Sequence, residues 1–196
     1  MYKYFLFNKP YRVLSQFSKE GDKKTLADFF PDVPKNIYPV GRLDYDSEGL
    51  LLLTDDKSLT SRLLEPSFEH PRTYLVQVDG AITGAAVEKL EKGVSINIEG
   101  TIYQTKKAKA KTIEPPAFIK ERNPPVRFRK NIPTSWISLT LTEGKNRQVR
   151  KMTATVGYPT LRLIRYSIGN IKLDGIEEGK YVTFGYEIKE IMFNMK

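Results

Sequence analysis

The chain has no cysteine and only one histidine, His70, among its 196 residues. The absence of cysteine excludes disulfides, thiolate nucleophiles and thiolate-bound metals. His70 precedes Pro71 in a predicted loop, and we expect it to take no catalytic part. The sequence also contains no Ser-His-Asp set, metal-ligand cluster or Walker motif. Acid–base or nucleophilic chemistry would therefore fall to carboxylates, tyrosines or lysines.

Long apolar segments are also lacking. No run approaches the roughly 18 apolar residues that a membrane-spanning helix needs. The apolar start of the chain is broken by Lys3, Asn8 and Lys9, which is not the layout of a secretory signal peptide. These absences predict a cytoplasmic protein that does not associate with membranes.

Acidic residues are too few to balance the basic ones. The chain has 32 Lys and Arg against 23 Asp and Glu, a net charge of +9. Between Gly144 and Leu173 no acidic residue occurs, but seven basic ones do: Lys145, Arg147, Arg150, Lys151, Arg162, Arg165 and Lys172. A second basic stripe contains Lys106, Lys107, Lys109 and Lys111. This excess favours a polyanionic partner such as nucleic acid, with a generic solvated basic surface as the alternative.

The pattern of apolar residues predicts many short strands and a few helices. We expect strands at 2–7, 50–54, 73–78, 95–99, 101–112, 136–142, 161–166, 168–173 and 181–184. We expect helices at 25–30, 58–64, 83–92 and 146–156, the last three capped by Ser58, Thr83 and Asn146. Gly93 is expected to end the helix 83–92. Residues 114–133 hold five prolines and should form a loop, either a plain linker or a basic insertion that contacts nucleic acid. Without strict βαβ alternation, the pattern indicates one α+β domain with a largely antiparallel sheet.

The segment 41–54 places three carboxylates next to an apolar run. Asp44, Asp46 and Glu48 stand in a turn-rich stretch that leads directly into four leucines. Carboxylates held at the mouth of a buried strand are candidates for chemistry. Two alternatives remain at this point. The spacing partly resembles a calcium loop of the EF-hand kind, although the preceding residues are a poor helix. The carboxylates could also form ordinary surface ion pairs.

A second candidate site is the segment 143–152, which follows a predicted strand and opens a predicted helix. On that helix Arg147, Arg150 and Lys151 lie three and four residues apart, on one side. A helix N-terminus that is rich in Lys and Arg suits phosphate binding. A solvated basic face is the alternative.

These segments together resemble a known family, the RNA pseudouridine synthases, in the branch that modifies ribosomal RNA. The resemblance rests on segments 8–10, 41–54, 72–74, 143–152, 157–159 and 163–169, which occur in the family's order. One departure is Arg72, where many members have lysine. The chain also begins directly at the first catalytic strand, so we expect no S4-type RNA-binding domain.

The resemblance implies a fold, a reaction and a set of catalytic residues. The fold would be a single catalytic domain over residues 1–196, α+β, with an active-site cleft between two halves. The enzyme would be an isomerase that converts a uridine of 23S rRNA to pseudouridine without cofactor or metal. Asp44 would be the nucleophile, Arg150 its ion-pair partner, Tyr74 the ring that stacks on uracil, and Leu163 part of the pocket wall.

The resemblance also implies RNA contacts. We expect Arg42, Lys145, Arg147, Gln148, Lys151 and Arg165 to bind the RNA around a flipped-out uridine. We expect the protein to act as a monomer with ribosomal RNA as its partner. Two alternatives remain: a small-subunit rRNA pseudouridine synthase, and a non-catalytic RNA-binding or ribosome-assembly protein on the same fold.

Overall fold

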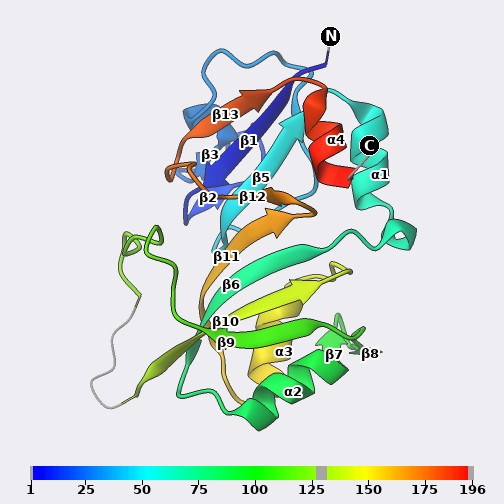
Figure 1. Cartoon of the computed structure of the whole chain (residues 1–196). Coiled ribbons are helices and arrows are strands. Elements are labelled where there is room, and N and C mark those ends of the chain that lie inside the picture. Colours follow the sequence, from blue (N-terminus) through cyan, green and yellow to red (C-terminus); the bar gives the residue numbers. More distant parts are fainter. Residues whose placement is uncertain (1, 127–131, 194–196) are drawn as a thin grey trace. The chain divides into compact units, whose positions relative to one another are not determined.

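The computed structural model describes residues 2–126 and 132–193 (Figure 1). Arg127, Arg129 and Lys130, which we considered as part of a basic insertion, lie outside the described residues. By its internal contacts the chain divides into two compact units. The first unit comprises Met1–His70 and Arg165–Lys196, and the second comprises Pro71–Ile164.

The first unit is organised around two paired strands, β1 (Tyr4–Lys9) and β5 (Glu48–Thr54). They run antiparallel, with Tyr4 opposite Thr54 and Lys9 opposite Gly49. The other edge of β1 pairs with β13 (Tyr181–Phe184), and β5 is followed in the sheet by β11 (Thr160–Ile168), whose residues from Arg165 onward belong to this unit. Shorter strands complete the unit: β2 (Val13–Leu14), β3 (Lys24–Thr25), β4 (Tyr38–Pro39) and β12 (Ile171–Lys172). All seven residues of β5 are buried, as expected for a strand with apolar residues on both faces.

Four short helical elements belong to the first unit: η1 (Leu26–Asp28), α1 (Lys57–Leu64), η2 (Pro66–Phe68) and α4 (Glu187–Phe193). Thr25 and Asp28 form a capping box at η1. Next to it, Phe30 packs edge-on against Phe5 and Phe7 at ring distances of 5.9 and 5.0 Å. The aromatic cluster thus fixes η1 on the strand β1.

The second unit is an antiparallel sheet with helices on one face. Strands β6 (Arg72–Asp79), β10 (Thr134–Leu141) and β9 (Lys109–Ile113) lie in that order. The unit also contains two helices, α2 (Gly84–Lys92) and α3 (Gln148–Thr155), and a hairpin formed by β7 (Ser95–Ile98) and β8 (Thr101–Gln104). The core contains Val76, Leu90, Ile137, Leu139 and Met152, which come from both strands and helices. Among the described residues, no helix has the length and apolar character needed to cross a membrane.

The structure confirms the α+β class and most of the expected elements, and it corrects some boundaries. Helix α2 begins and ends as predicted, at the Thr83 cap and Gly93. Two predicted caps are wrong, because Asp56 caps α1 and Arg147 stands at the N-cap of α3. The predicted strand 101–112 is two strands, β8 and β9, because β8 pairs with β7 whereas β9 pairs with β10. Helix α4 was not predicted.

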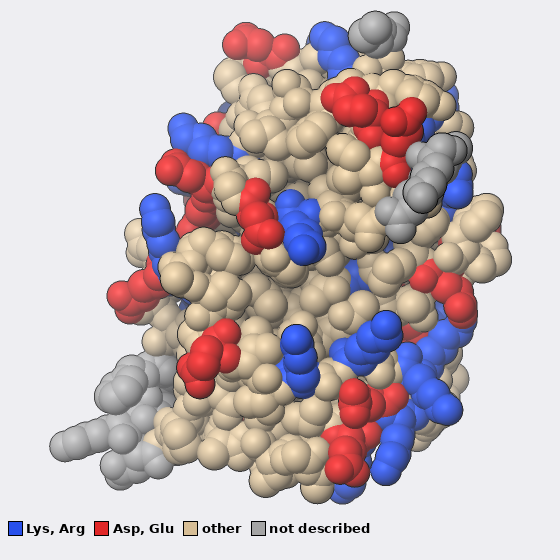
Figure 2. Space-filling view, in the orientation of Figure 1, with Lys and Arg blue, Asp and Glu red and all other residues tan. Residues whose placement is uncertain are grey.

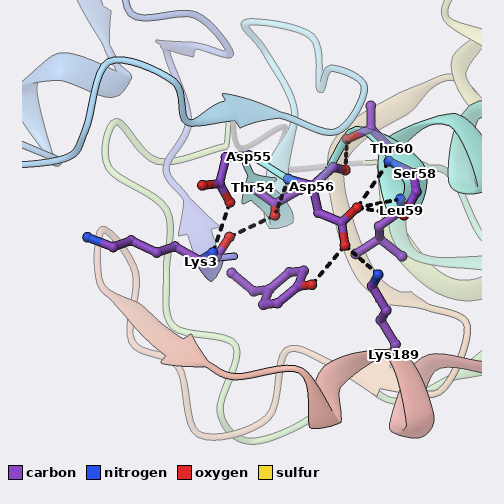
Figure 3. Close-up of polar contacts among 9 residues, drawn as sticks. Lys3, Thr54, Asp55, Asp56, Ser58, Leu59, Thr60 and Lys189 are labelled. Atoms are coloured by element: carbon purple, nitrogen blue, oxygen red, sulfur yellow. Dashed lines mark hydrogen bonds and ion pairs between the residues drawn. The ribbon is translucent and has the colours of Figure 1, made fainter. Parts of the chain in front are cut away.

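A buried carboxylate, Asp56, links the two ends of the first unit (Figure 3). Asp56 is fully buried and accepts hydrogen bonds from the N–H groups of Ser58 and Leu59 and from the hydroxyl of Tyr4 (2.8 Å). Lys189 of α4 forms an ion pair with the same carboxylate. Burial by itself would raise the pKa of Asp56, but the donors from Lys189, Ser58, Leu59 and Tyr4 outweigh it and hold the pKa well below its ordinary value. Asp56 thus connects α1, β1 and α4.

We expect Asp56→Asn to lower the free energy of unfolding by about 3 kcal/mol near neutral pH, because Lys189 loses its buried counter-charge. The folded-state pKa lies below the unfolded value, so an acidified unfolded chain takes up the proton first. The stabilisation is therefore present above about pH 4 and is lost at lower pH. Urea unfolding of both proteins at pH 7 and pH 3 should show the difference shrinking.

Asp55→Asn is the matched control, since Asp55 is adjacent but half-buried. Its carboxylate accepts from the N–H of Lys3 (2.9 Å) and the amide of Asn36 (3.1 Å), with no ammonium partner among these bonds. Its substitution should cost clearly less than that of Asp56. Equal losses for the two variants would contradict a special role for the Asp56–Lys189 pair.

Candidate active site

Asp44 lies in the loop that enters β5. Its side chain is half-buried, whereas the neighbouring Leu43 is 7 % exposed and belongs to the core. The carbonyl of Asp44 accepts a hydrogen bond from the N–H of Ser47 (3.0 Å), which forms a tight turn. Ser47 and Glu48 are then buried as the strand begins. The loop thus holds a carboxylate at the mouth of a buried strand, as the sequence predicted.

Gly49 permits a close approach of backbones beside this loop. Its φ is +102°, and a Cβ at this position would lie 2.4 Å from the carbonyl oxygen and 2.7 Å from the nitrogen of Arg165. Both values are too short for any side chain, so only glycine fits. The guanidinium of Arg165 is itself buried, and its Nε donates to the carbonyl of Leu50 at 2.8 Å. Arg165 therefore helps to hold β5 in place.

Lys9 is a fully buried lysine beneath the Asp44 loop. Its ammonium donates to the carbonyls of Pro10 (2.9 Å) and Val13 (2.7 Å). Burial lowers the pKa of Lys9 to about 7, although Glu48, Asp46 and Asp44 act in the opposite direction. Asp46 and Glu48 thus belong to the electrostatic surroundings of Lys9.

We expect the contribution of Lys9 to the free energy of unfolding to depend on pH. The ordinary pKa is 10.5 and the folded-state pKa is about 7, so between these values the unfolded chain binds the proton and the folded chain does not. Raising the pH through this window therefore favours the folded state. The free energy of unfolding of the wild type relative to Lys9→Met should rise by roughly 2 kcal/mol between pH 7.5 and 9.5. Urea unfolding at the two pH values measures it.

Lys172→Met provides the control, because Lys172 is exposed on β12. The stability difference between the wild type and this variant should change little over the same pH range. A difference for Lys9→Met that stays flat from pH 7.5 to 9.5 would show that Lys9 keeps its proton in the folded state.

In the second unit, two buried polar residues shape the segment before α3. Glu143 accepts hydrogen bonds from the hydroxyl of Tyr103 (2.5 Å), the N–H of Lys106 (2.9 Å) and the amide of Gln148 (2.5 Å). The side-chain oxygen of Gln148 accepts a hydrogen bond from the N–H of Lys145 (2.9 Å). These bonds fix the turn from which Lys145 projects, exposed, with its ammonium 4.9 Å from the ring centre of Tyr103.

The second unit contains three of the predicted site residues, Tyr74, Leu163 and Arg150. Tyr74 lies on β6 opposite Leu139 and is half-buried. It packs against the apolar cluster that contains Leu163, which is 6 % exposed. Arg150 follows in the first turn of α3 and is half-buried. Asp44 belongs to the other unit, so the Asp44–Arg150 ion pair stays a prediction.

The residues predicted to contact RNA fall into two groups. Arg42, Lys145 and Arg147 are exposed and Lys151 is half-buried, so a ligand can reach them. Gln148 is only 3 % exposed and its amide donates to Glu143, and Arg165 is only 5 % exposed and its Nε donates to the carbonyl of Leu50. Their predicted contacts with RNA stay predictions. Figure 2 shows one face of the molecule, on which basic side chains are interspersed with acidic ones.

The calcium-loop alternative is wrong. An EF-hand needs a helix on each side of its loop. Here the strand β4 precedes Asp44, and β5 begins at Glu48, inside the segment that would have to coordinate the ion. The resemblance to a calcium loop was confined to the spacing of the carboxylates.

The proline-rich segment is tied to β11 within the second unit. Arg122 donates to the carbonyl of Pro124 (2.9 Å), and Arg162, which is 7 % exposed, donates to the carbonyl of Lys120 (2.7 Å). The described part of this segment is therefore anchored by buried and half-buried arginines, in contrast to a plain linker.

Sequence reasoning assigned no role to Lys9 or Glu143. The signal for Lys9 was its place between Asn8 and Pro10, directly after an apolar run. Glu143 carried a signal in being the acidic residue next to a long basic stretch. These signals do not predict burial or bonding partners. Tyr103 and Lys106 are distant from Glu143 in sequence, and the bonds of Lys9 to the nearby carbonyls of Pro10 and Val13 depend on how the backbone turns there.

The fold is shared with known structures. A crystal structure described as a pseudouridylate synthase matches with a TM-score of 0.78 at 29 % sequence identity, over 98 % of this chain and 74 % of that chain. Human RNA pseudouridylate synthase domain containing 1 matches with a TM-score of 0.56 at 15 % identity, over 93 % of this chain and 78 % of that chain. The second likeness concerns the fold alone.

Sequence comparison identifies the family. Residues 3–155 match the RNA pseudouridylate synthase family. Ribosomal large subunit pseudouridine synthase E of Vibrio parahaemolyticus is 52 % identical over 91 % of this chain and 72 % of its own length. The Xanthomonas axonopodis pv. citri protein of the same name is 49 % identical over 87 % and 88 %. The chain belongs to the RNA pseudouridylate synthase family and is an isomerase that acts on RNA.

Proposed function

We propose that this enzyme converts a uridine of large-subunit ribosomal RNA to pseudouridine, with Asp44 as the nucleophile. The observation that carries this proposal is the identity of about one half with two relatives named ribosomal large subunit pseudouridine synthase E. The placement of Asp44 supports it, since a half-buried carboxylate on a fixed loop can meet a base inserted from solution. The cytoplasmic location and the monomeric state stay predictions.

The reaction rearranges one nucleotide and needs no further substrate. The N1–C1′ bond breaks, the uracil turns, and C5 forms a bond to C1′ while it loses its proton and N1 gains one. The Asp44 carboxylate would attack either C1′ of the ribose or C6 of the uracil. In the first case it traps a cation-like sugar, as a carboxylate does in retaining glycosidases.

The second unit would supply the remaining groups. Tyr74 would stack on the uracil and assist loss of the C5 proton, and Leu163 would form an apolar wall. Arg150 would place its positive charge beside the Asp44 carboxylate and so stabilise the ionised form when RNA covers the site. Flipping a base out of folded RNA costs a few kcal/mol, which phosphate contacts offset. The exposed Arg42, Lys145 and Arg147, with half-buried Lys151, would provide those contacts.

We expect Asp44→Asn to abolish pseudouridine formation and to leave RNA affinity within about threefold of the wild type, because the amide keeps the shape but is not a nucleophile. Tritium release from RNA labelled at uridine C5 measures the reaction, and filter binding measures the affinity. Asp46→Asn, in the same loop, is the control and should retain turnover.

Appreciable tritium release by Asp44→Asn would contradict the nucleophile assignment. If the wild type releases no tritium from 23S rRNA fragments but does so from 16S fragments, the substrate is the RNA of the small subunit. Binding with no release on either RNA would favour a non-catalytic RNA-binding protein.

We expect Lys145→Ala to weaken RNA binding and to reduce the slope of log K against log salt by about one, because each phosphate-bound cation releases condensed counterions. Lys145 is exposed beside Tyr103, so the substitution leaves the core intact. Lys89→Ala, exposed on α2, is the matched control and should leave the slope unchanged. An unchanged slope for Lys145→Ala would remove this lysine from the RNA surface.

A further inference from the structure

We infer that Ser15 is a positioning residue for Asp44, and that its hydroxyl sets the rate of isomerisation through the backbone of the Asp44 loop. The inference rests on the proposed role of Asp44 as the nucleophile. Ser15 lies 29 positions before Asp44 in the chain and directly follows β2.

The Ser15 hydroxyl bonds twice to one residue of the loop. It donates to the carbonyl oxygen of Leu43 at 2.8 Å, and it accepts from the N–H of the same residue at 3.1 Å. Both polar groups of Leu43 are thus satisfied by one side chain. Since a residue's N–H and C=O fix its orientation, Ser15 sets the direction in which the chain enters Asp44.

The same segment also holds the residue on the other side of Asp44. The N–H of Arg12 donates to the carbonyl of Tyr45 at 2.8 Å. Arg12 has a φ of +57°, a conformation that non-glycine residues rarely adopt. The segment Tyr11–Gln16 therefore bonds to the residues immediately before and after Asp44. The backbone of the proposed nucleophile is fixed from both sides by a segment that is distant in sequence.

This segment is itself anchored, so it can serve as a fixed reference. Lys9 donates to the carbonyl of Val13 at 2.7 Å, and the N–H of Leu26 donates to the carbonyl of Gln16 at 2.9 Å. Val13 is 1 % exposed and Ser15 is 6 % exposed. Water has little access to replace the hydroxyl at this depth. Loss of the hydroxyl therefore leaves two backbone groups of Leu43 unsatisfied.

A direct chemical role for Ser15 does not fit this geometry. Its single hydroxyl proton is directed to the Leu43 carbonyl, and the side chain is buried. It therefore acts through Asp44. A displacement of about 1 Å in a catalytic group is enough to cost on the order of a hundredfold in rate.

The test is Ser15→Ala, compared with Thr54→Ala as a matched control. Thr54 stands at the opposite end of β5 and is 2 % exposed. Its hydroxyl makes the same kind of bridge, donating to the carbonyl of Lys3 (2.7 Å) and accepting from the N–H of Asp56 (3.1 Å). The two variants thus lose equivalent bonds, and only one loses them at the Asp44 loop. Tritium release gives kcat and KM, and thermal unfolding gives stability.

We expect similar decreases in Tm for both variants. We expect kcat of Ser15→Ala to fall about 10- to 100-fold with KM within about twofold of the wild type, because substrate binding does not use the hydroxyl. Thr54→Ala should keep kcat within about twofold. Ser15→Thr, which retains the hydroxyl, should recover most of the lost kcat.

The inference is overturned if kcat of Ser15→Ala stays within about twofold of that of Thr54→Ala at a temperature where both are folded. It is also overturned if Ser15→Thr is folded and no more active than Ser15→Ala. Should Ser15→Ala fail to fold, Ser15→Cys replaces it, with a weaker donor and an expected smaller fall in kcat. Asp44→Asn separates the two proposals: if that variant turns over, the assignment of Asp44 as the nucleophile fails, whatever Ser15 does.

Discussion

The burial of β5 between its neighbouring strands is the constraint on which the first unit depends. All seven of its residues are buried, and its partner β1 fixes its register over six residue pairs. A strand that is apolar on both faces is held in the interior of the sheet, because leaving that place would expose its leucines to water. The close approach of Arg165 to Gly49 locks the start of the strand. The loop that carries Asp44 leads directly into this strand, so one end of the loop is fixed in position.

Buried polar groups complete the construction in both units. In the first unit, Lys9 and Ser15 bond to backbone carbonyls near the Asp44 loop. In the second, Gln148 donates to Glu143, Glu143 accepts from the N–H of Lys106, and Gln148 accepts from the N–H of Lys145 before α3. A buried polar group without partners would destabilise the fold, so each of these groups requires its hydrogen-bond partners at suitable distances and angles. The exposed basic residues, in contrast, are accessible to a ligand.

The sequence predicted those features that local patterns encode. The apolar run of 50–53 indicated β5, and Thr83 with Gly93 indicated the ends of α2. The motif order identified Asp44, Tyr74 and Arg150 as candidates. Distant partners decided what was missed: α4 is a seven-residue helix whose Lys189 meets Asp56 over a separation of 133 positions. The burial of Gln148 depends on the nearby Glu143 and on the apolar cluster packed with α3, which includes residues distant in sequence.

The division of the chain into units has a consequence for its synthesis. The first unit is built from the two ends of the sequence, and the second lies wholly between them. Strand β13 can pair with β1, and Lys189 can complete the bonds of Asp56, only after residues 181–189 have left the ribosome. The middle of the chain is available to fold before that. The unit that carries the proposed nucleophile is therefore begun first and finished last, and until then the edge of β1 lacks the partner that shields it from other chains.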